Sequence, residues 1–366
     1  PLRIMDLIKD FNVRSYQPGD EDSIVDLLKL AFPEWARREA ALDHWKWKYL
    51  DSPLGTDIVV AESEGKIIGV SHNMRLKLKM GRSAVFAQYS CDTTTHQDYR
   101  RFGVFRRLIE EVEKIRLEKK VKLGYGISGN PAIIHEWGKR GRIPLPHHIA
   151  YMHRIRDIGL HLRMRPTKKA ALLSAGFKTL DNLNKIRRVF KRRTKSNNDF
   201  ELVEIERFTD NADVFWAEIQ KHYSFMTDKS SKFLNWRYCD PRAGRFIVKQ
   251  AIKHGEVLGY IVHELRKDGR YPEGFIDDLS ALPARLDVVH ALLRDSCNYF
   301  DGLNVNAVHY MVVRGHPYQA ISVNNAFLDS RRTPYITCQI IDAERDFEVL
   351  KVSSPGQIHF THGDTL

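Results

Sequence analysis

The chain has 366 residues, of which 43% are hydrophobic and 10% aromatic, enough for two packed domains and too apolar for general disorder. No apolar run reaches the roughly 18–20 residues of a membrane-spanning helix, the start PLRIMDLIKD lacks a secretory signal, and the four scattered cysteines form no CxxC pair. The formal net charge of +12 equals that of segment 154–195 alone, where 14 lysines and arginines face two acids. We therefore expect a reduced, cytoplasmic protein without a metal site.

Strands and amphipathic helices alternate in the first 155 residues. A strand at 13–16 precedes a helix that carries Ile24, Leu27, Leu28 and Phe32 on one face. The further predicted elements are strands at 57–62, 66–74 and 83–94, a helix at 103–119, a strand at 123–127, a helix at 131–139 and a strand around 149–155. The helix at 103–119 is expected to bury Val104, Phe105, Leu108, Ile109, Val112 and Ile115. The order is β, helix, three-stranded meander, helix, β, helix, β.

The junction CDTTTHQDYRRFGVFRRL, residues 91–108, is the most informative stretch of the chain. A strand runs into a basic turn with Gly103, which then opens a long helix. The N–H groups and dipole of a helix start favour phosphate, and glycine lets a ligand approach the backbone. Arg100, Arg101, Arg106 and Arg107 add positive charge. An ordinary helix start with arginines on its solvent face would show the same pattern, so this junction alone leaves both interpretations open.

The junction resembles the phosphate-binding motif of the GNAT acyl-CoA N-acyltransferases, Q/R-x-x-G-x-G/A. Arg100 and Gly103 match its first two fixed positions, whereas Phe105 stands where glycine or alanine is usual. The resemblance covers most of residues 12–155 and, more weakly, 200–345. It implies an α+β fold of two tandem GNAT-like domains, each a mostly antiparallel central sheet flanked by helices. The expected division is 1–155 for the acetyl-CoA-binding domain, 156–199 for a basic helical linker and 200–366 for a degenerate second copy.

The resemblance also implies where coenzyme A would bind. Its pyrophosphate would lie on backbone N–H groups from Arg101 to Arg106, its pantetheine arm would pair with the strand at Thr93–Thr95, and an N–H near Thr93 would polarise the thioester carbonyl. Phe105 would have to point into the core. The expected cofactor-binding residues are Thr93, Thr94, Thr95, Arg100, Arg101, Phe102, Gly103, Val104, Phe105, Arg106 and Asn130.

Direct attack by an amine on a thioester needs a proton acceptor, and a proton donor helps the thiolate to leave. Strand parity places Tyr89 and Cys91 on the face where family members carry their base, and His72 and His135 are titratable alternatives. Each of these could equally be an ordinary packing or surface residue. The tyrosine that often donates the proton in this family is replaced by Trp137, so either another residue donates or the thiolate leaves unaided.

The basic segment carries apolar residues at three- and four-residue steps, which predicts a helix with a basic face. Three interpretations stay open: a linker helix docked on the body, a peripheral contact of 156–195 with acidic lipid or a polyanionic substrate, and a nucleic-acid contact. The last has the least support because no stacking aromatics or known motif accompany the charge.

One stretch of the chain occurs twice. WKYLDSPLGTDIVVAESEGKIIGV begins at Trp47 and WRYCDPRAGRFIVKQAIKHGEVLGY at Trp236, 189 residues later, and Gly69 and Gly259 keep nearly the same spacing. This predicts duplication of one fold, with strands at 246–252, 256–265 and 274–280 in the second copy. The tryptophans are expected to pin the preceding helix onto the sheet. The second copy reads LPARLDVVHALL at the phosphate turn, without the arginine–glycine motif, so we expect that it has lost the cofactor site. The tail FTHGDTL is expected to form part of the acceptor cleft.

The predicted function is transfer of an acetyl group from acetyl-CoA, without a metal, to a primary amine such as an amino sugar. A tandem GNAT-like transferase of aminoacyl or longer acyl groups and a non-catalytic binding module are the alternatives. Because a fused pair would mimic a dimer, we expect a monomer.

Overall fold

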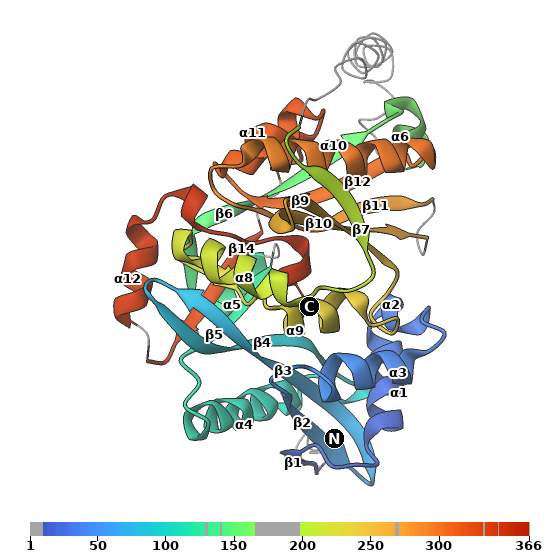
Figure 1. Cartoon of the computed structure of the whole chain (residues 1–366). Helices are drawn as coiled ribbons and strands as arrows, with labels where there is room; N and C mark the ends of the chain where they lie inside the picture. The colour runs from blue at the N-terminus through green and yellow to red at the C-terminus, as the bar shows by residue number, and fades with distance from the viewer. Residues whose placement is uncertain are drawn as a thin grey trace.

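The computed structural model describes residues 10–128, 131–139, 141–164, 198–267, 271–331, 334–342 and 344–365. These residues form a 14-stranded sheet with the order β1-β2-β3-β4-β5-β14-β6-β12-β11-β10-β9-β7, with β8 beside β3 and β13 beside β6 (Figure 1). Neighbouring strands are antiparallel except for the parallel pairs β4–β5 and β11–β12.

The first half of the chain contains β1 (Asn12–Ser15), α1 (Glu21–Ala31), α2 (Pro33–Ala36), α3 (Ala41–Trp45), the π-helical turn η2 (Lys46–Leu50), β2 (Thr56–Ser63), β3 (Lys66–Met80), β4 (Ser83–Thr95), the 3₁₀ turn η3 (Gln97–Tyr99), α4 (Val104–Glu118), β5 (Leu123–Ser128), α5 (Pro131–Lys139), β6 (Ile143–Ile155) and α6 (Ile158–Met164). The predicted order of strands and helices is confirmed here.

The second half repeats this order. It contains β7 (Glu201–Ile205), α8 (Asp210–Ile219), η4 (Gln220–His222), β8 (Phe225–Thr227), α9 (Ser231–Leu234), the π-helical turn η5 (Asn235–Cys239), β9 (Phe246–Lys253), β10 (Glu256–Arg266), β11 (Glu273–Ala281), α10 (Leu286–Gly302), β12 (Ala307–Val313), α11 (Pro317–Asn324), β13 (Leu328–Asp329), β14 (Tyr335–Ile340), α12 (Glu344–Val352), η6 (Pro355–Gln357) and η7 (His362–Asp364). The predicted meander is present as β9, β10 and β11.

Helix α4 packs on β2 and β3 through Val104, Leu108, Val112 and Ile115, which recur at three- and four-residue steps. The expectation that Phe105 belongs to this buried face is wrong, since 47% of its surface is exposed. One residue along a helix turns by about 100°, so the neighbour of Val104 leaves the buried stripe. The other face of β2–β4 packs against α1 in a separate core cluster, because successive strand residues point to opposite faces.

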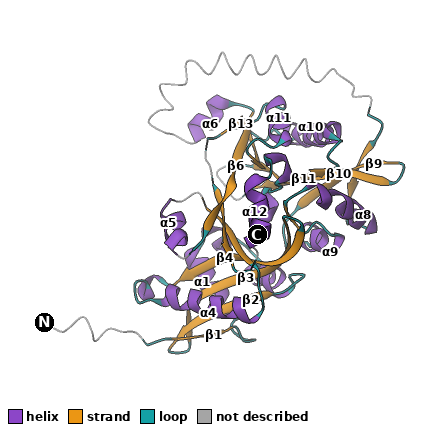
Figure 2. Ribbon diagram, turned by 90° about the vertical axis from the view of Figure 1, so that its left-hand side faces the viewer, coloured by secondary structure: helices purple, strands orange, loops and turns teal. Residues whose placement is uncertain are grey.

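The two halves exchange strands. β14, from the second half, lies antiparallel between β5 and β6 of the first, while the C-terminal part of β6 pairs with β12 from Ile155↔Ala307 to Ile149↔Val313. Figure 2 shows β6 running from the lower to the upper half. The division at residues 155 and 199 stays a prediction, but a cut there would separate strands that are paired in one sheet. Most of the expected linker lies outside the described residues.

The duplicated tryptophans join the halves to each other. The Trp47 indole N–H donates to the Trp236 carbonyl at 2.8 Å, and the Trp236 indole N–H donates to the Trp47 carbonyl at 3.1 Å. Their rings stack with centroids 5.2 Å apart. This reciprocal contact adds an interface role that the sequence pattern did not predict, and it belongs to one large core containing residues of both halves. Among the described residues, no helix is long and apolar enough to cross a bilayer.

Candidate active site

A β-bulge interrupts the pairing of β3 and β4 at Asp92. The register pairs His72 with Cys91 and Val70 with Thr94, so Asp92 and Thr93 together oppose Ser71. Asp92 has a φ of 43°, which is uncommon outside glycine and tolerated by aspartate. Bulges re-aim the neighbouring side chains and backbone groups, and here they do so at the residues predicted to face the thioester.

β4 and β5 separate just beside this bulge. Their parallel pairing covers only residues 87–89 and 123–125, whereas β4 continues to Thr95 and β5 continues to Ser128, paired on its other edge with β14. One backbone edge of Thr93–Thr95 therefore faces a gap between strands. The hydroxyl oxygen of Thr95 is buried and has no hydrogen-bond partner among the described residues. An extended polar chain such as pantetheine fits this edge, because it can supply the hydrogen bonds that a second strand would make.

Helix α4 begins in a conformation that opens its first turn to a ligand. Its N-cap Gly103 has a φ of 85°, lacks a capping side chain, and has no atom within 4 Å of where a Cβ would stand. The first N–H groups of a helix have no partner inside the helix and attract anions. The expected cations around this start, Arg100, Arg101, Arg106 and Arg107, are all exposed, and Phe102 and Phe105 flank it with 40% and 47% of their surfaces exposed. The four arginines suit a polyphosphate, but the exposed Phe105 does not meet the requirement, set by the resemblance, that its side chain point into the core.

The equivalent place in the second half is already filled. Arg285, before α10, forms ion pairs of 2.7 Å with Asp287 and Asp199, so its charge is neutralised. At the edge of β11, the Tyr318 hydroxyl accepts from the Ala281 N–H at 3.0 Å, and a ring nitrogen of His359 donates to the Leu279 carbonyl at 3.0 Å. Within the described residues this half offers neither the basic helix start nor the open strand edge.

His72, a candidate base, is completely buried and both ring nitrogens are engaged. Nε2 accepts from the Trp45 indole at 3.0 Å, so Nδ1 carries the proton and donates to the Asp92 carbonyl at 3.3 Å. Burial lowers the pKa of His72 to about 3, which keeps the ring neutral. In this arrangement His72 holds the bulge in place, with its ring stacked on Tyr49 at 3.8 Å.

The other candidates lie in different surroundings. Tyr89 is buried against Tyr125, and burial raises the pKa of its hydroxyl far above 10. Burial likewise raises the pKa of Cys91 to about 12. His135 lies exposed on α5. Asn130 lies outside the described residues, as does the side chain of Trp137. The structure thus places Tyr89 and His72 on one face of β3 and β4. The Thr93 side chain lies on the other face, where its hydroxyl contacts that of Ser71 at 3.1 Å, and His135 lies on another element.

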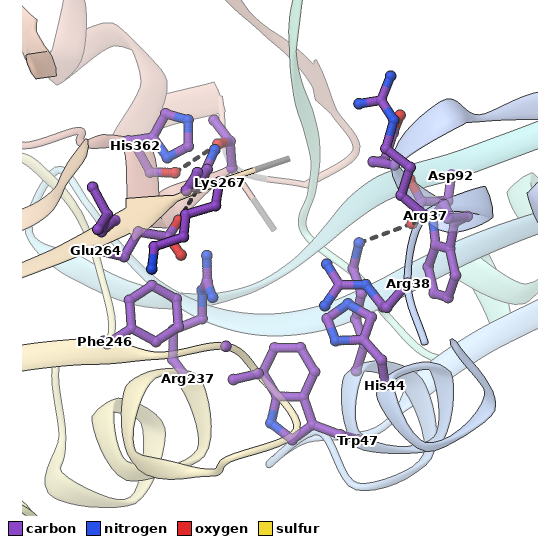
Figure 3. A pocket seen from close by; sticks show the side chains of 18 residues that line it. Arg37, Arg38, His44, Trp47, Asp92, Arg237, Phe246, Glu264, Lys267 and His362 are labelled. Carbon is purple, nitrogen blue, oxygen red and sulfur yellow. Dashed lines mark hydrogen bonds and ion pairs between the residues drawn. The ribbon is translucent and has the colours of Figure 1, made fainter. Parts of the chain in front are cut away.

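A cleft of about 540 Å³ opens between the two halves next to the bulge. Figure 3 shows Asp92 in one wall, with His44 and Trp47, and Phe246, Glu264 and His362 in the opposite wall. His362 and Thr365 come from the tail FTHGDTL, which therefore contributes to the wall, although Asp364 is buried behind it.

Asp92 is the site residue that sequence reasoning missed. Its carboxylate accepts from Lys48 at 2.8 Å, from the Trp35 indole at 3.2 Å and from the Tyr49 hydroxyl. Burial alone would raise the pKa of Asp92, but Lys48 and Tyr49 hold it at about 2, so the group stays ionised. An aspartate within a β-rich run, where this residue type is disfavoured, was the available signal.

Comparisons with known proteins agree with this geometry. Residues 12–138 match the family model described as an acetyltransferase (GNAT) domain. The whole fold is similar to a probable N-acyltransferase from Enterococcus faecalis, with a TM-score of 0.63, 11% identity, and coverage of 92% of this chain and 74% of that one. It is also similar to a GCN5-related N-acetyltransferase from Anabaena variabilis, with a TM-score of 0.62, 12% identity, and coverage of 90% of this chain and 73% of that one. A third similar structure is Saccharomyces cerevisiae N-myristoyltransferase with bound myristoyl-CoA, with a TM-score of 0.60, 10% identity, and coverage of 90% of this chain and 79% of that one. No curated protein sequence matches the chain.

Residues 12–138 match a GNAT acetyltransferase domain, and the chain as a whole shares the fold of the N-acyltransferase structures described above.

Proposed function

We propose that this chain is an acyl-CoA-dependent N-acyltransferase, acting from its first half, that transfers an acetyl group from acetyl-CoA to a primary amine of a small metabolite, such as an amino sugar. The observation that carries the proposal is the position of the bulge at Asp92–Thr93. It stands between the open edge of β4, where the donor would bind, and the cleft, where the acceptor would enter. Donor and acceptor would meet there and nowhere else along the described part of β4.

Each part of the proposed site then has a defined task, whether it is a backbone group or a side chain. Backbone N–H groups from Arg101 to Arg106 would hold the pyrophosphate, and the β4 edge would hold the pantetheine arm. A backbone N–H near Thr93 would stabilise the charge that develops on the carbonyl oxygen. Tyr89 keeps its proton at neutral pH, so it suits donation to the departing thiolate better than removal of a proton from the amine. His72 is better placed to fix the bulge than to act as base.

Transfer of a longer acyl group is the second candidate. The observation in its favour is the fold similarity, over 90% of this chain, to N-myristoyltransferase with bound myristoyl-CoA. The acetyl and longer-chain proposals share the donor site and differ only in what the acyl pocket accepts. The acyl-length preference of the protein separates them.

The test compares Gly103→Asp with Gly103→Asn. Both side chains tolerate a positive φ and both cap a helix start, but only aspartate places a negative charge where the pyrophosphate would bind. We expect acetyl-CoA at about 100-fold over its Kd to stabilise the wild type by about 2.7 kcal/mol, a shift of several degrees in Tm. The asparagine variant should keep most of this shift and the aspartate variant should lose it.

Thiol release from acetyl-CoA and from myristoyl-CoA, in the presence of a panel of amines, then reports the acyl preference. A folded wild type whose Tm is unchanged by either acyl-CoA would contradict the donor site and leave a non-catalytic module as the remaining interpretation.

A further inference from the structure

The walls of the cleft carry more positive than negative charge. Six of its lining residues are cationic and three are acidic: Arg37, Arg38, Lys48, Arg237, Arg266 and Lys267, against Glu34, Asp92 and Glu264. Two of the acids are already engaged, because Lys48 holds Asp92 and Arg266 holds Glu264. The net charge of the side chains that line the cleft is therefore positive beside the proposed reaction centre.

Arg237 is the buried member of this set. Only 8% of its surface is exposed, yet within the described residues no carboxylate lies within ion-pairing distance of its guanidinium. Its Nε donates to the Gly363 carbonyl at 3.4 Å, and the group lies 5.2 Å from the ring centre of Tyr238 and 5.5 Å from that of Phe246. Figure 3 shows it projecting beside Phe246 into the cleft. A buried charge that forms no direct ion pair is costly, so this arrangement favours an anionic ligand.

The duplication explains why Arg237 lacks a counter-charge. Arg237 occupies the position in the second copy that Lys48 occupies in the first, and Lys48 pairs with Asp92. The counterpart of Asp92 is Asp278, since Tyr238 contacts Asp278 as Tyr49 contacts Asp92. Asp278 is instead bound at 2.8 Å by the fully buried Lys229. The carboxylate that would neutralise Arg237 is therefore occupied.

The nearby acids do not replace it. Arg266 binds both Glu264 and Asp277, and His362 also holds Asp277 at 2.9 Å. Burial, together with the charge of Asp277, raises the pKa of Glu264 to about 7, so its negative charge is incomplete at neutral pH.

We propose that the cleft selects acceptor amines whose far end carries an anionic group, a carboxylate or a phosphate, bound by Arg237 with the help of Arg38 and Lys267. This inference rests on the proposed N-acyltransferase function. Asp92, which binds Lys48, marks the reacting end in one wall. Figure 3 shows Arg237 and Phe246 in the opposite wall. The amine would reach the bulge while its anionic end is held across the cleft.

The test uses matched amines that differ only in the far group. 6-Aminohexanoate is compared with 6-aminohexanamide, and 6-aminohexyl phosphate with 6-aminohexanol, along with shorter homologues of each. Thiol release from acetyl-CoA gives kcat/KM, and calorimetry without acyl-CoA gives the affinity for each amine. We expect at least one anionic amine to exceed its neutral partner by about tenfold in both readouts, because charge-assisted hydrogen bonds are stronger than neutral ones. The carboxylate and phosphate arms distinguish the two anions.

Three variants test whether Arg237 causes the preference for anionic amines. Arg237→Gln should abolish the preference, Arg237→Lys should retain part of it, and Lys66→Gln, at the exposed β2–β3 turn, should leave it unchanged. If Arg237→Gln does not fold, the pair Arg38→Gln and Lys267→Gln tests the same site from more exposed positions.

Equal rates and affinities for charged and neutral amines would overturn this inference while leaving the proposed function intact. Absence of thiol release with every amine would count against the proposed function. The calorimetric comparison would still decide the anion site, because it needs no donor.

Discussion

At the scale of single residues, Asp92 joins the backbone at the proposed reaction centre to the wall of the cleft. Its positive φ sets the direction of the strand, and its carboxylate holds Lys48, Trp35 and Tyr49 of the preceding helical segments against β4. His72 contacts the same residue from the other side through the Asp92 carbonyl. The geometry of the bulge therefore depends on polar contacts that converge on one residue.

Replacing Asp92 with asparagine should weaken this arrangement. Asparagine tolerates the same φ but leaves the ammonium of Lys48, which is 11% exposed, without its counter-charge. We expect a loss of about 1–3 kcal/mol in the free energy of unfolding, measured by urea titration, and a fall in kcat larger than any rise in KM. Asp98→Asn, on an exposed carboxylate in η3, is the matched control and should stay within about 0.5 kcal/mol of the wild type. Equal stabilities for the two variants would contradict the assigned role of Asp92.

Sequence reasoning reached the neighbourhood of the site but not its contacts. The strand that ends at Thr95 and the turn at Gly103 were predicted because strand, turn and helix signals are local, whereas the role of Thr93–Thr95 came from the family resemblance and stays a prediction. That both nitrogens of His72 are engaged depends on Trp45 and on the backbone of another strand, which no local pattern encodes. Phe105 was misplaced because a family motif position does not fix which way a helical residue turns.

At the scale of elements, the position of α4 on the sheet sets the direction of its first N–H groups. Gly69 on β3 makes this close approach feasible, since a Cβ there would lie 2.8 Å from Val104 and 3.1 Å from Leu108. Gly259 on β10 is its repeat counterpart, where a Cβ would lie 2.7 Å from the Ser280 carbonyl.

Gly69→Ala should therefore displace α4, whereas Gly259→Ala should disturb only the second half. We expect both variants to lose about 1–3 kcal/mol of stability by overpacking. Only Gly69→Ala should weaken acetyl-CoA binding, which calorimetry would measure on the folded fraction of each protein. Equal weakening of acetyl-CoA binding by the two variants would show that the position of α4 does not control the donor site.

The sequence did not predict the exchange of strands between the two halves. The meanders of both halves were predicted because each consists of adjacent strands joined by short turns. The residue patterns of β6 and β14 do not indicate which half each strand pairs with. Alternation of apolar and polar residues predicts which face of a strand is buried, but it does not predict which strand is its neighbour. Their partners are set by the long-range packing of two halves.

At the scale of the whole molecule, the second half lacks the open features of the first. Its own strand edge is filled by Tyr318 and His359, and Asp278, the counterpart of Asp92, is bound by Lys229, which also holds Asp364 of the tail. The halves are joined by exchanged strands and by the reciprocal pair of Trp47 and Trp236. This arrangement leaves a cleft between the halves, which we propose as the acceptor site, and we retain the prediction of a monomer that resembles a fused dimer.

Buried histidines should also make the protein sensitive to acid. Burial lowers the pKa values of His44, His72 and His316 to about 3 in each case. In the unfolded chain these groups bind protons near pH 6.5, so between pH 6.5 and 3 the unfolded state binds more protons and stability falls as pH falls. At pH 5 each histidine should cost about 2 kcal/mol. Glu264 acts in the opposite direction, because its raised pKa makes stability fall as pH rises from about 4.5 to 7.

Urea unfolding at pH 7.5, 6 and 5 should therefore show that the free energy of unfolding falls steeply as pH falls, since the effect of three histidines is larger than the opposite effect of one glutamate. His316 provides the matched variant: its Nδ1 accepts from the Tyr318 N–H at 3.1 Å as the N-cap of α11, a role that asparagine can also fill. His316→Asn should match the wild type near pH 7.5 and recover about 2 kcal/mol of the loss at pH 5. Parallel pH profiles for the two proteins would show that His316 takes up its proton without unfolding, and hence that the buried histidines do not set the acid limit of the fold.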